Sequence, residues 1–208
     1  MRPLKLLLIF SVCVFVISCA IRTPLKETKE GMDITLPTLM ERLSHIKEIK
    51  GSALVDLRMS GGSMSGDASI MVRPDSFDVK IYSMGFPAGE IKMQNGVFES
   101  SHQLRKEEEI VIIKCLKEGI FWWNSTDINI TSTDCLFYLK RPGQVIALDK
   151  KTLKPLEQVI ALPGGERLHI TYKEAQKIEG IWFPAKIQAT SAKYSLTIEF
   201  DKIDIIMN

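Results

Sequence analysis

Hydrophobic and polar side chains alternate with a period of two between Gly51 and Phe98. The alternating runs are separated by the turn signals Gly61-Gly62, Pro74-Asp75 and Asn95-Gly96. Such alternation indicates strands with one buried face, and short turns between strands favour antiparallel pairing. The pattern therefore predicts an antiparallel meander of four or five strands in this part of the chain.

Two stretches have a helical pattern instead. In Pro37–Lys50 the apolar residues recur at steps of three and four, and Gly51 follows as a stop signal. In Gln103–Gly119 an acidic start precedes an apolar run, which suits the dipole of a helix. We therefore predict one helix before the meander and one after it.

Alternation resumes after Gly119 and continues to the end of the chain. It predicts about ten or eleven strands in total, with two main helices and no internal repeat. The expected fold class is mainly β (α+β): an unclosed antiparallel β-barrel with a helical lid over an apolar cavity. The residues expected to line the cavity, whose alternative role is ordinary core packing, are Val55, Leu57, Ile70, Phe77, Val79, Ile81, Leu168, Ile170, Leu196 and Ile198.

The first 18 residues have the organisation of a secretory signal peptide. Arg2 and Lys5 precede the apolar run 6–17, which at about a dozen residues is shorter than the about 20 needed to span a bilayer. The end of the run, Val16-Ile17-Ser18-Cys19, resembles the lipobox of bacterial lipoproteins. This resemblance implies cleavage after Ser18 and lipidation of Cys19. The alternative is an ordinary signal peptide in which Cys19 is incidental.

The mature chain is expected to have two parts. Residues 19–35 hold the lipidated cysteine and a polar, flexible tether, and residues 36–208 form a single domain. Ala20 follows the cysteine, and in such lipoproteins a residue other than Asp there favours the outer membrane, with the domain facing the periplasm.

Charge and cysteine content narrow the function classes. Without Arg2 and Lys5 the chain has 25 basic and 25 acidic side chains, so nucleic acid is not an expected partner. Cys115 and Cys135 remain after processing, and they form either a disulfide or two buried free thiols.

The sequence offers little catalytic chemistry. His45, His102 and His169 have no ligand-type neighbour at metal-binding spacing, and no nucleotide-binding motif is present. We therefore expect no catalytic residues, metal or cofactor, and a protein that is not an enzyme.

The segment Tyr82–Glu90 joins two predicted strands and contains Met84, Phe86 and Pro87 among small residues. It is either a bulged turn whose Phe86 lies in the core or a protruding loop that offers Met84, Phe86 and Pro87 to a membrane or cargo.

The order of these features resembles the LolB-like outer-membrane lipoproteins and, more broadly, the LolA/LolB-like superfamily. The best segments are 51–99 and 181–208, including Trp182-Phe-Pro-Ala-Lys186 and Leu196-Thr-Ile-Glu-Phe200. The resemblance implies an unclosed barrel with a helical lid. It also implies a protruding loop in which Phe86 replaces the Leu of LolB and is followed by Pro87.

The resemblance makes a carrier the leading hypothesis. Such a protein, expected to be a monomer, binds the acyl chains of a lipoprotein or lipid and helps insert them into the outer membrane. Its expected partners are outer-membrane lipid and an acylated cargo delivered by a LolA-like periplasmic carrier. Two alternatives remain: a structural accessory of an outer-membrane or polysaccharide assembly with a filled core, and a lipid-binding sensor.

Overall fold

The computed structural model describes residues 34–59, 61–124 and 127–207. Their main feature is a 12-stranded sheet in which every neighbouring pair is antiparallel. The strands are β1 (Ile46–Met59), β2 (Gly62–Val72), β3 (Phe77–Ser83), β4 (Phe86–Gln94), β5 (Val97–Ser100), β6 (Asn129–Ser132), β7 (Leu136–Arg141), β8 (Gln144–Asp149), β9 (Pro155–Ala161), β10 (Arg167–Ile178), β11 (Ile181–Thr190) and β12 (Ser195–Met207).

The sheet is curved but does not close. Its order is β5-β4-β3-β2-β1-β12-β11-β10-β9-β8-β7-β6, so β5 and β6 are free edges of four residues each. Two glycines permit close backbone approach within it. A Cβ at Gly51 would lie 1.9 Å from the Lys202 carbonyl oxygen, and one at Gly66 would lie 2.1 Å from that of Tyr82. Larger residues at these two positions would force neighbouring strands apart.

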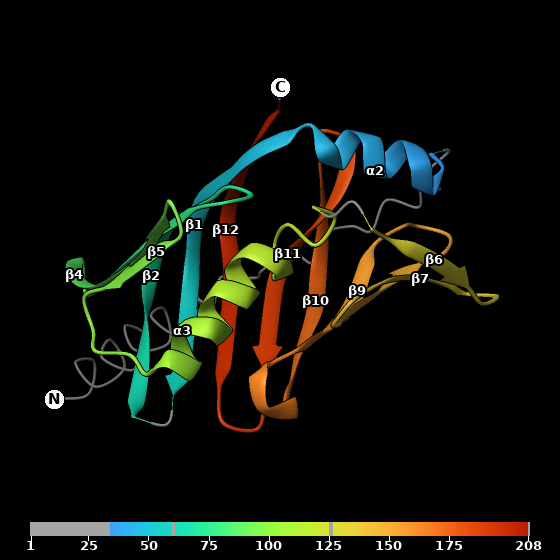
Figure 1. Cartoon of the computed structure of the whole chain (residues 1–208). Helices are drawn as coiled ribbons and strands as arrows, with labels where there is room; N and C mark the ends of the chain where they lie inside the picture. Colours follow the sequence, from blue (N-terminus) through green and yellow to red (C-terminus); the bar gives the residue numbers. More distant parts are fainter. Residues whose placement is uncertain (1–33, 60, 125–126, 208) are drawn as a thin grey trace, which may run out of the picture. The chain divides into compact units, whose positions relative to one another are not determined.

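Two helices contribute to the core. Helix α2 (Leu36–Ser44) begins at its N-cap Thr35 and buries Leu36, Leu39 and Leu43. Helix α3 (Lys106–Ile113) continues into the π-helix η1 (Lys114–Gly119), and together they cross the concave face of the sheet (Figure 1). A short 3₁₀ turn, η2 (Pro163–Gly165), joins β9 to β10.

The fold class predicted from the sequence is confirmed: the protein is mainly β, antiparallel and unclosed, with a helix on its concave face. The described residues form 12 strands where about ten or eleven were expected. The edge strand β6 has four exposed residues, so its sequence has no alternation by which it could be recognised.

The predicted helix Pro37–Lys50 is wrong in its second half. Helix α2 ends at Ser44, and residues 46–50 open strand β1. Ile46 and Ile49 are both buried because the pairing of β1 with β12 shifts register between Ile46 and Glu48. This irregularity places two residues three apart on one face, a spacing that resembles a helix.

The proposed signal peptide, Cys19 and nearly all of the tether lie outside the described residues. Among the residues that the structure describes, no helix is long and apolar enough to cross a membrane.

Candidate functional site

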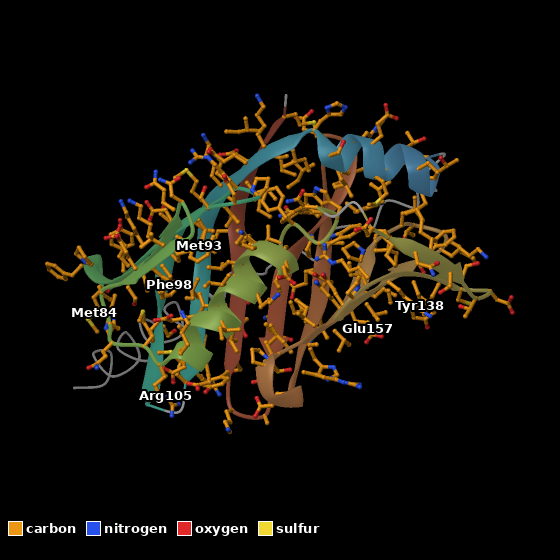
Figure 2. All side chains as sticks on the ribbon, viewed as in Figure 1. Met84, Met93, Phe98, Arg105, Tyr138 and Glu157 are labelled. Atoms are coloured by element: carbon orange, nitrogen blue, oxygen red, sulfur yellow. The ribbon has the colours of Figure 1, made fainter. Side chains whose placement is uncertain are left out.

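The hairpin between β3 and β4 presents an apolar tip, which we define as residues 84–87. Met84 and Gly85 form its apex with φ angles of 52° and 81°, and Ser83 pairs with Phe86. Met84 is 96% exposed and Phe86 is 74% exposed, and Pro87 is exposed beside them. Phe86 therefore does not lie in the core, and Met84 points away from the sheet (Figure 2).

Charged side chains follow directly behind the apolar tip. Lys80 on β3 faces Glu90 on β4 in register, and the Lys80 Nζ lies 3.8 Å from the Glu90 Oε1 and 3.8 Å from the Asp78 Oδ2. Exposed pairs of this kind contribute little to stability. Their consequence is a sharp boundary between an apolar apex and a charged hairpin stem.

The interior beneath α3 is apolar. A small void there is lined by seven of the ten residues predicted for the cavity, namely Val55, Leu57, Ile70, Val79, Ile81, Leu196 and Ile198. Phe77, Leu168 and Ile170 are buried but lie outside this lining.

Three lining residues were not singled out from the sequence. Ile112 and Leu116 come from α3 and η1, where their four-residue spacing marks one helix face, and Ile91 comes from β4, where it alternates with Met93.

The predicted cavity is not open in this structure. The void has a volume of only about 10 Å³, which is room for one water molecule at most. Ile112 and Leu116 project from the helix into the space, and Phe121, Trp122 and Trp123 are also buried in the core. The expectation of a spacious cavity under the helix is therefore corrected to a filled interior.

An open pocket of about 450 Å³ lies beside this interior, at the end of the sheet that carries the apolar tip. Its lining includes Met59, Met64, Ser83, Ala88 and Glu108. Leu57, which lines the void, pairs across β1 and β2 with Met64, which lines the pocket. The pocket, which we call the mouth, thus adjoins the apolar interior at this pair of residues and has polar side chains in its lining.

Another hollow, of about 680 Å³, lies on the outer face of β1, β2, β3 and β12. It is lined by charged and small polar residues such as Lys50, Ser69 and Lys202. Ala68, Ile70 and Met71 also contribute to its lining, so this hollow is a shallow surface of mixed polar and apolar character on the face opposite α3.

The C-terminal end of η1 is fastened to the sheet by buried polar groups. Gln158 on β9 donates from Nε2 to the Glu118 carbonyl oxygen at 3.1 Å. The Tyr172 hydroxyl on β10 lies 2.7 Å from the Gly119 carbonyl oxygen and also within hydrogen-bond distance of the Gln158 Oε1. Carbonyls at a helix end have no partner within the helix, so these side chains satisfy them.

Arg141 on β7 adds a positive charge near the same helix end. Its Nη2 lies 4.0 Å from the Glu118 Oε2, and its Nη1 donates to the Asn124 carbonyl oxygen at 3.4 Å. Burial lowers the pKa of Arg141, and the charge of Glu118 opposes this effect. A cation is favourable near a helix C-terminus.

The N-terminal end of α3 is capped by a charged pair. The buried Glu108 accepts from the Arg105 backbone N–H at 2.9 Å and from the Arg105 Nη2 at 2.9 Å. A side-chain hydrogen bond with Tyr194, which precedes β12, raises the pKa of Arg105, and Glu108 adds to the effect. The N-terminal end of the α3–η1 helix is therefore capped by Arg105 and Glu108, and its C-terminal end is bonded to the sheet by Gln158 and Tyr172.

The two described cysteines are free thiols, so the possible disulfide between Cys115 and Cys135 is not formed. Cys115 is buried in η1, and burial raises its pKa to about 12. Cys135 is exposed. Of the two thiols that were expected to be buried if unpaired, only Cys115 is buried.

No group of three or more His, Cys, Asp or Glu side chains that could hold a metal ion is found in the described part of the chain. The candidate site consists of the filled interior under α3–η1, the mouth and the apolar tip.

Comparison with solved structures identifies this architecture. The LolA superfamily protein from Nitrosomonas europaea superposes with a TM-score of 0.52 at 12% identity, covering 84% of this chain and 95% of that one. The chain has the LolA-superfamily fold. This confirms at the level of the fold the resemblance that the order of sequence features indicated.

Two further structures align less closely with this LolA-like fold. A DUF1329 family protein from Desulfovibrio piger has a TM-score of 0.47 at 11% identity, covering 80% of this chain and 88% of its own. A domain from Vibrio parahaemolyticus described as an outer membrane lipoprotein-sorting protein has a TM-score of 0.45 at 12% identity, covering 79% and 89%. No protein-family model and no curated protein matches the sequence.

Proposed function

We propose that this protein is a lipid-anchored carrier of acyl chains. In this proposal Cys19 holds it in the outer membrane, facing the periplasm, and it accepts the acyl chains of a lipoprotein or lipid from a LolA-like carrier. The observation that carries the proposal is the exposed apolar tip, Met84 and Phe86, beside the mouth of an apolar interior. The protein acts as a monomer without catalytic residues or cofactors.

The driving force is burial of apolar surface, worth about 0.8 kcal/mol for each methylene. An acyl chain gains this free energy equally in the interior and in the bilayer, so its transfer needs no chemical energy. Because the void measures about 10 Å³, loading requires Ile112 and Leu116 to move away from the sheet. The cost of that movement favours release of the chain to the membrane.

A second candidate is a structural accessory of an outer-membrane or polysaccharide assembly. The filled interior favours it, because a core packed at normal density needs no ligand. In that case α3–η1 is a permanent part of the core. A sensor that retains its lipid is disfavoured by the same filled interior.

The test that separates these candidates is native mass spectrometry of residues 20–208, purified with minimal detergent. The carrier predicts a bound lipid mass and acceptance of an acylated lipoprotein from a LolA-like carrier. A domain with no lipid that accepts no cargo would contradict the carrier and support the accessory.

A further inference from the structure

Two methionines and a histidine, far apart in the sequence, contribute to the lining of the mouth. Met59 is the last residue of β1, Met64 lies on β2, and His102 lies in the segment between β5 and α3. Met59 pairs in register with Gly62 and Met64 pairs with Leu57, so the two methionines are diagonal neighbours on the inner face of the β1–β2 hairpin. Diagonal neighbours lie about 7–8 Å apart, which long side chains can bridge.

Gly89 on β4 is the position at which Met64 and His102 come together. A Cβ at Gly89 would lie 2.7 Å from the Met64 Sδ and 3.2 Å from the His102 Cε1. Gly89 is not one of the glycines with a positive φ angle, so its backbone conformation does not require glycine. What the glycine provides is space, and the sulfur and the imidazole ring share that space.

Hydrogen bonds fix the position of the His102 ring. Its Nδ1 lies 3.1 Å from the Ser101 Oγ, which accepts a hydrogen bond from the Glu90 backbone N–H at 2.8 Å. The His102 backbone N–H donates to the Ser100 Oγ at 3.2 Å. When Nδ1 donates its proton to Ser101, the lone pair of Nε2 is left for a metal ion. Metal-bound histidines usually make such a hydrogen bond through their other ring nitrogen.

The donor atoms in the mouth select a soft metal ion. Two thioethers and one imidazole suit Cu⁺, whereas Mg²⁺, Ca²⁺ and Mn²⁺ prefer oxygen ligands. The carboxylate in the lining, Glu108, accepts hydrogen bonds from Arg105 and is therefore not a free ligand for a hard cation. The mouth is an open pocket of about 450 Å³, so an ion can reach it from solvent.

From these observations we propose that Met59, Met64 and His102 form a binding site for Cu⁺ in the mouth. The two Sδ atoms and the His102 Nε2 hold the ion, which thereby links the β1–β2 hairpin to the segment that leads into α3. This inference goes beyond the proposed function, because it requires neither a bound acyl chain nor the apolar tip.

The test is a titration of the purified full-length chain with Cu⁺, in competition with the chelator bathocuproine disulfonate. Ascorbate under nitrogen keeps the copper reduced. All proteins carry Cys13→Ser, Cys19→Ser and Cys135→Ser, because accessible thiols also bind Cu⁺. Cys115 is left in place, since it is buried and its pKa of about 12 keeps it protonated. We expect one tightly bound Cu⁺ per chain.

Substitution of the three proposed ligands tests where this ion binds. Met59→Leu, Met64→Leu and His102→Ala should each weaken Cu⁺ binding by about tenfold or more, since changes even outside the ligand shell weaken metal sites by about 10–100-fold. The matched controls are Met93→Leu, which is buried on β4 outside the mouth, and His169→Ala, which is exposed on β10. Both controls should bind Cu⁺ as the parent does.

Thermal melts check that the variants are folded. Leu keeps the volume of Met and is well tolerated in packed interiors. If Met64→Leu nevertheless unfolds, His102→Ala decides, because the His102 side chain is exposed.

Nuclear magnetic resonance with ¹³C-methyl methionine locates the ion directly. Ag⁺ serves as a soft probe that is not oxidised, and one equivalent should shift the methyl signals of Met59 and Met64 and leave that of Met93 unchanged. Failure to find saturable Cu⁺ binding would overturn the inference, as would binding that survives all three ligand substitutions. Equally tight binding of Zn²⁺ would also overturn it, because the site would then not select for soft ions.

Discussion

At the residue scale, Phe86 has a natural comparison in Val97. Both are exposed apolar residues, at 74% and 59%. Phe86 begins β4 at the apolar tip, whereas Val97 begins β5 after the turn at the other end of β4. The two residues therefore separate the effect of the tip from the effect of exposed apolar surface in general.

We expect Phe86→Glu to weaken binding of the domain to lipid vesicles by about tenfold to a hundredfold. The reason is that inserting a Phe side chain contributes about 1.5–3 kcal/mol. Val97→Glu should leave binding unchanged. Co-sedimentation with vesicles measures the binding, and thermal melts should show both variants within about 0.5 kcal/mol of the natural protein. Unfolding of Phe86→Glu would instead show that Phe86 is structural.

Cys115 makes stability depend on pH in the alkaline range. The folded protein retains the thiol proton up to a pKa of about 12, whereas the unfolded chain releases it near the ordinary value of 9.0. Above pH 9 the unfolded state therefore binds fewer protons, and the free energy of unfolding falls as pH rises.

The expected slope due to Cys115 is about 1.4 kcal/mol per pH unit between pH 9 and 12. Urea unfolding of the natural protein and of Cys115→Ala at pH 8 and pH 10.5 measures it. The Tyr172 pKa is also raised by burial and by the charge of Cys115, so the difference in slope between the two proteins reports Cys115 together with its effect on Tyr172. Equal slopes would show that the thiol is not buried in solution.

At the element scale, the α3–η1 helix combines an apolar face with polar fastenings at its ends. Its N-terminal end is capped by the Arg105–Glu108 pair, and its C-terminal end is bonded to the sheet by Tyr172 and Gln158. A π-helical segment such as η1 is often found at functional positions. If the helix must leave the sheet during loading, breaking these hydrogen bonds contributes to the free energy that the movement requires.

We expect Tyr172→Phe to destabilise the protein by about 1–3 kcal/mol, because it removes the hydroxyl that serves the Gly119 carbonyl and Gln158. It should also speed alkylation of Cys115 in the folded protein, since local opening of η1 becomes easier. Mass spectrometry after timed exposure to iodoacetamide measures the rate. Tyr138→Phe, on β7, is the control and should change neither quantity.

The elements show where sequence reasoning succeeds. Alternation located most strands, because one face of each is buried, and the acidic start of 106–109 marked α3 correctly. The spacing of Ile46 and Ile49 led to a wrong helix prediction, because a register shift in β1 places these two residues, three apart, on the same buried face. The exposure of Phe86 could not be decided either, since an apolar residue in a turn can face the core or solvent.

At the scale of the whole molecule, the lining of the interior was largely predictable but its volume was not. Seven predicted residues meet around one void because alternation fixes which face each side chain occupies. The volume depends on how closely α3–η1 approaches the sheet, and this depends on long-range packing of residues such as Gly119 and Ile170. A Cβ at Gly119 would lie 2.9 Å from the Ile170 Cδ1, a closeness that local sequence patterns do not reveal.

The filled interior leads to a test that compares two buried leucines. Leu116 lines the void from η1, whereas Leu43 is buried in α2 outside it. Replacing either with Ala should destabilise the protein by about 2–5 kcal/mol, because each leaves a cavity in a packed core. If acyl chains enter beneath α3–η1, only Leu116→Ala should bind a fluorescent fatty acid more tightly, since it supplies space where the chain must fit. Fluorescence titration measures the affinity and urea unfolding the stability. An equal response in both variants would mean that binding follows general loosening of the fold, and no response in either would favour the accessory with a permanently filled core.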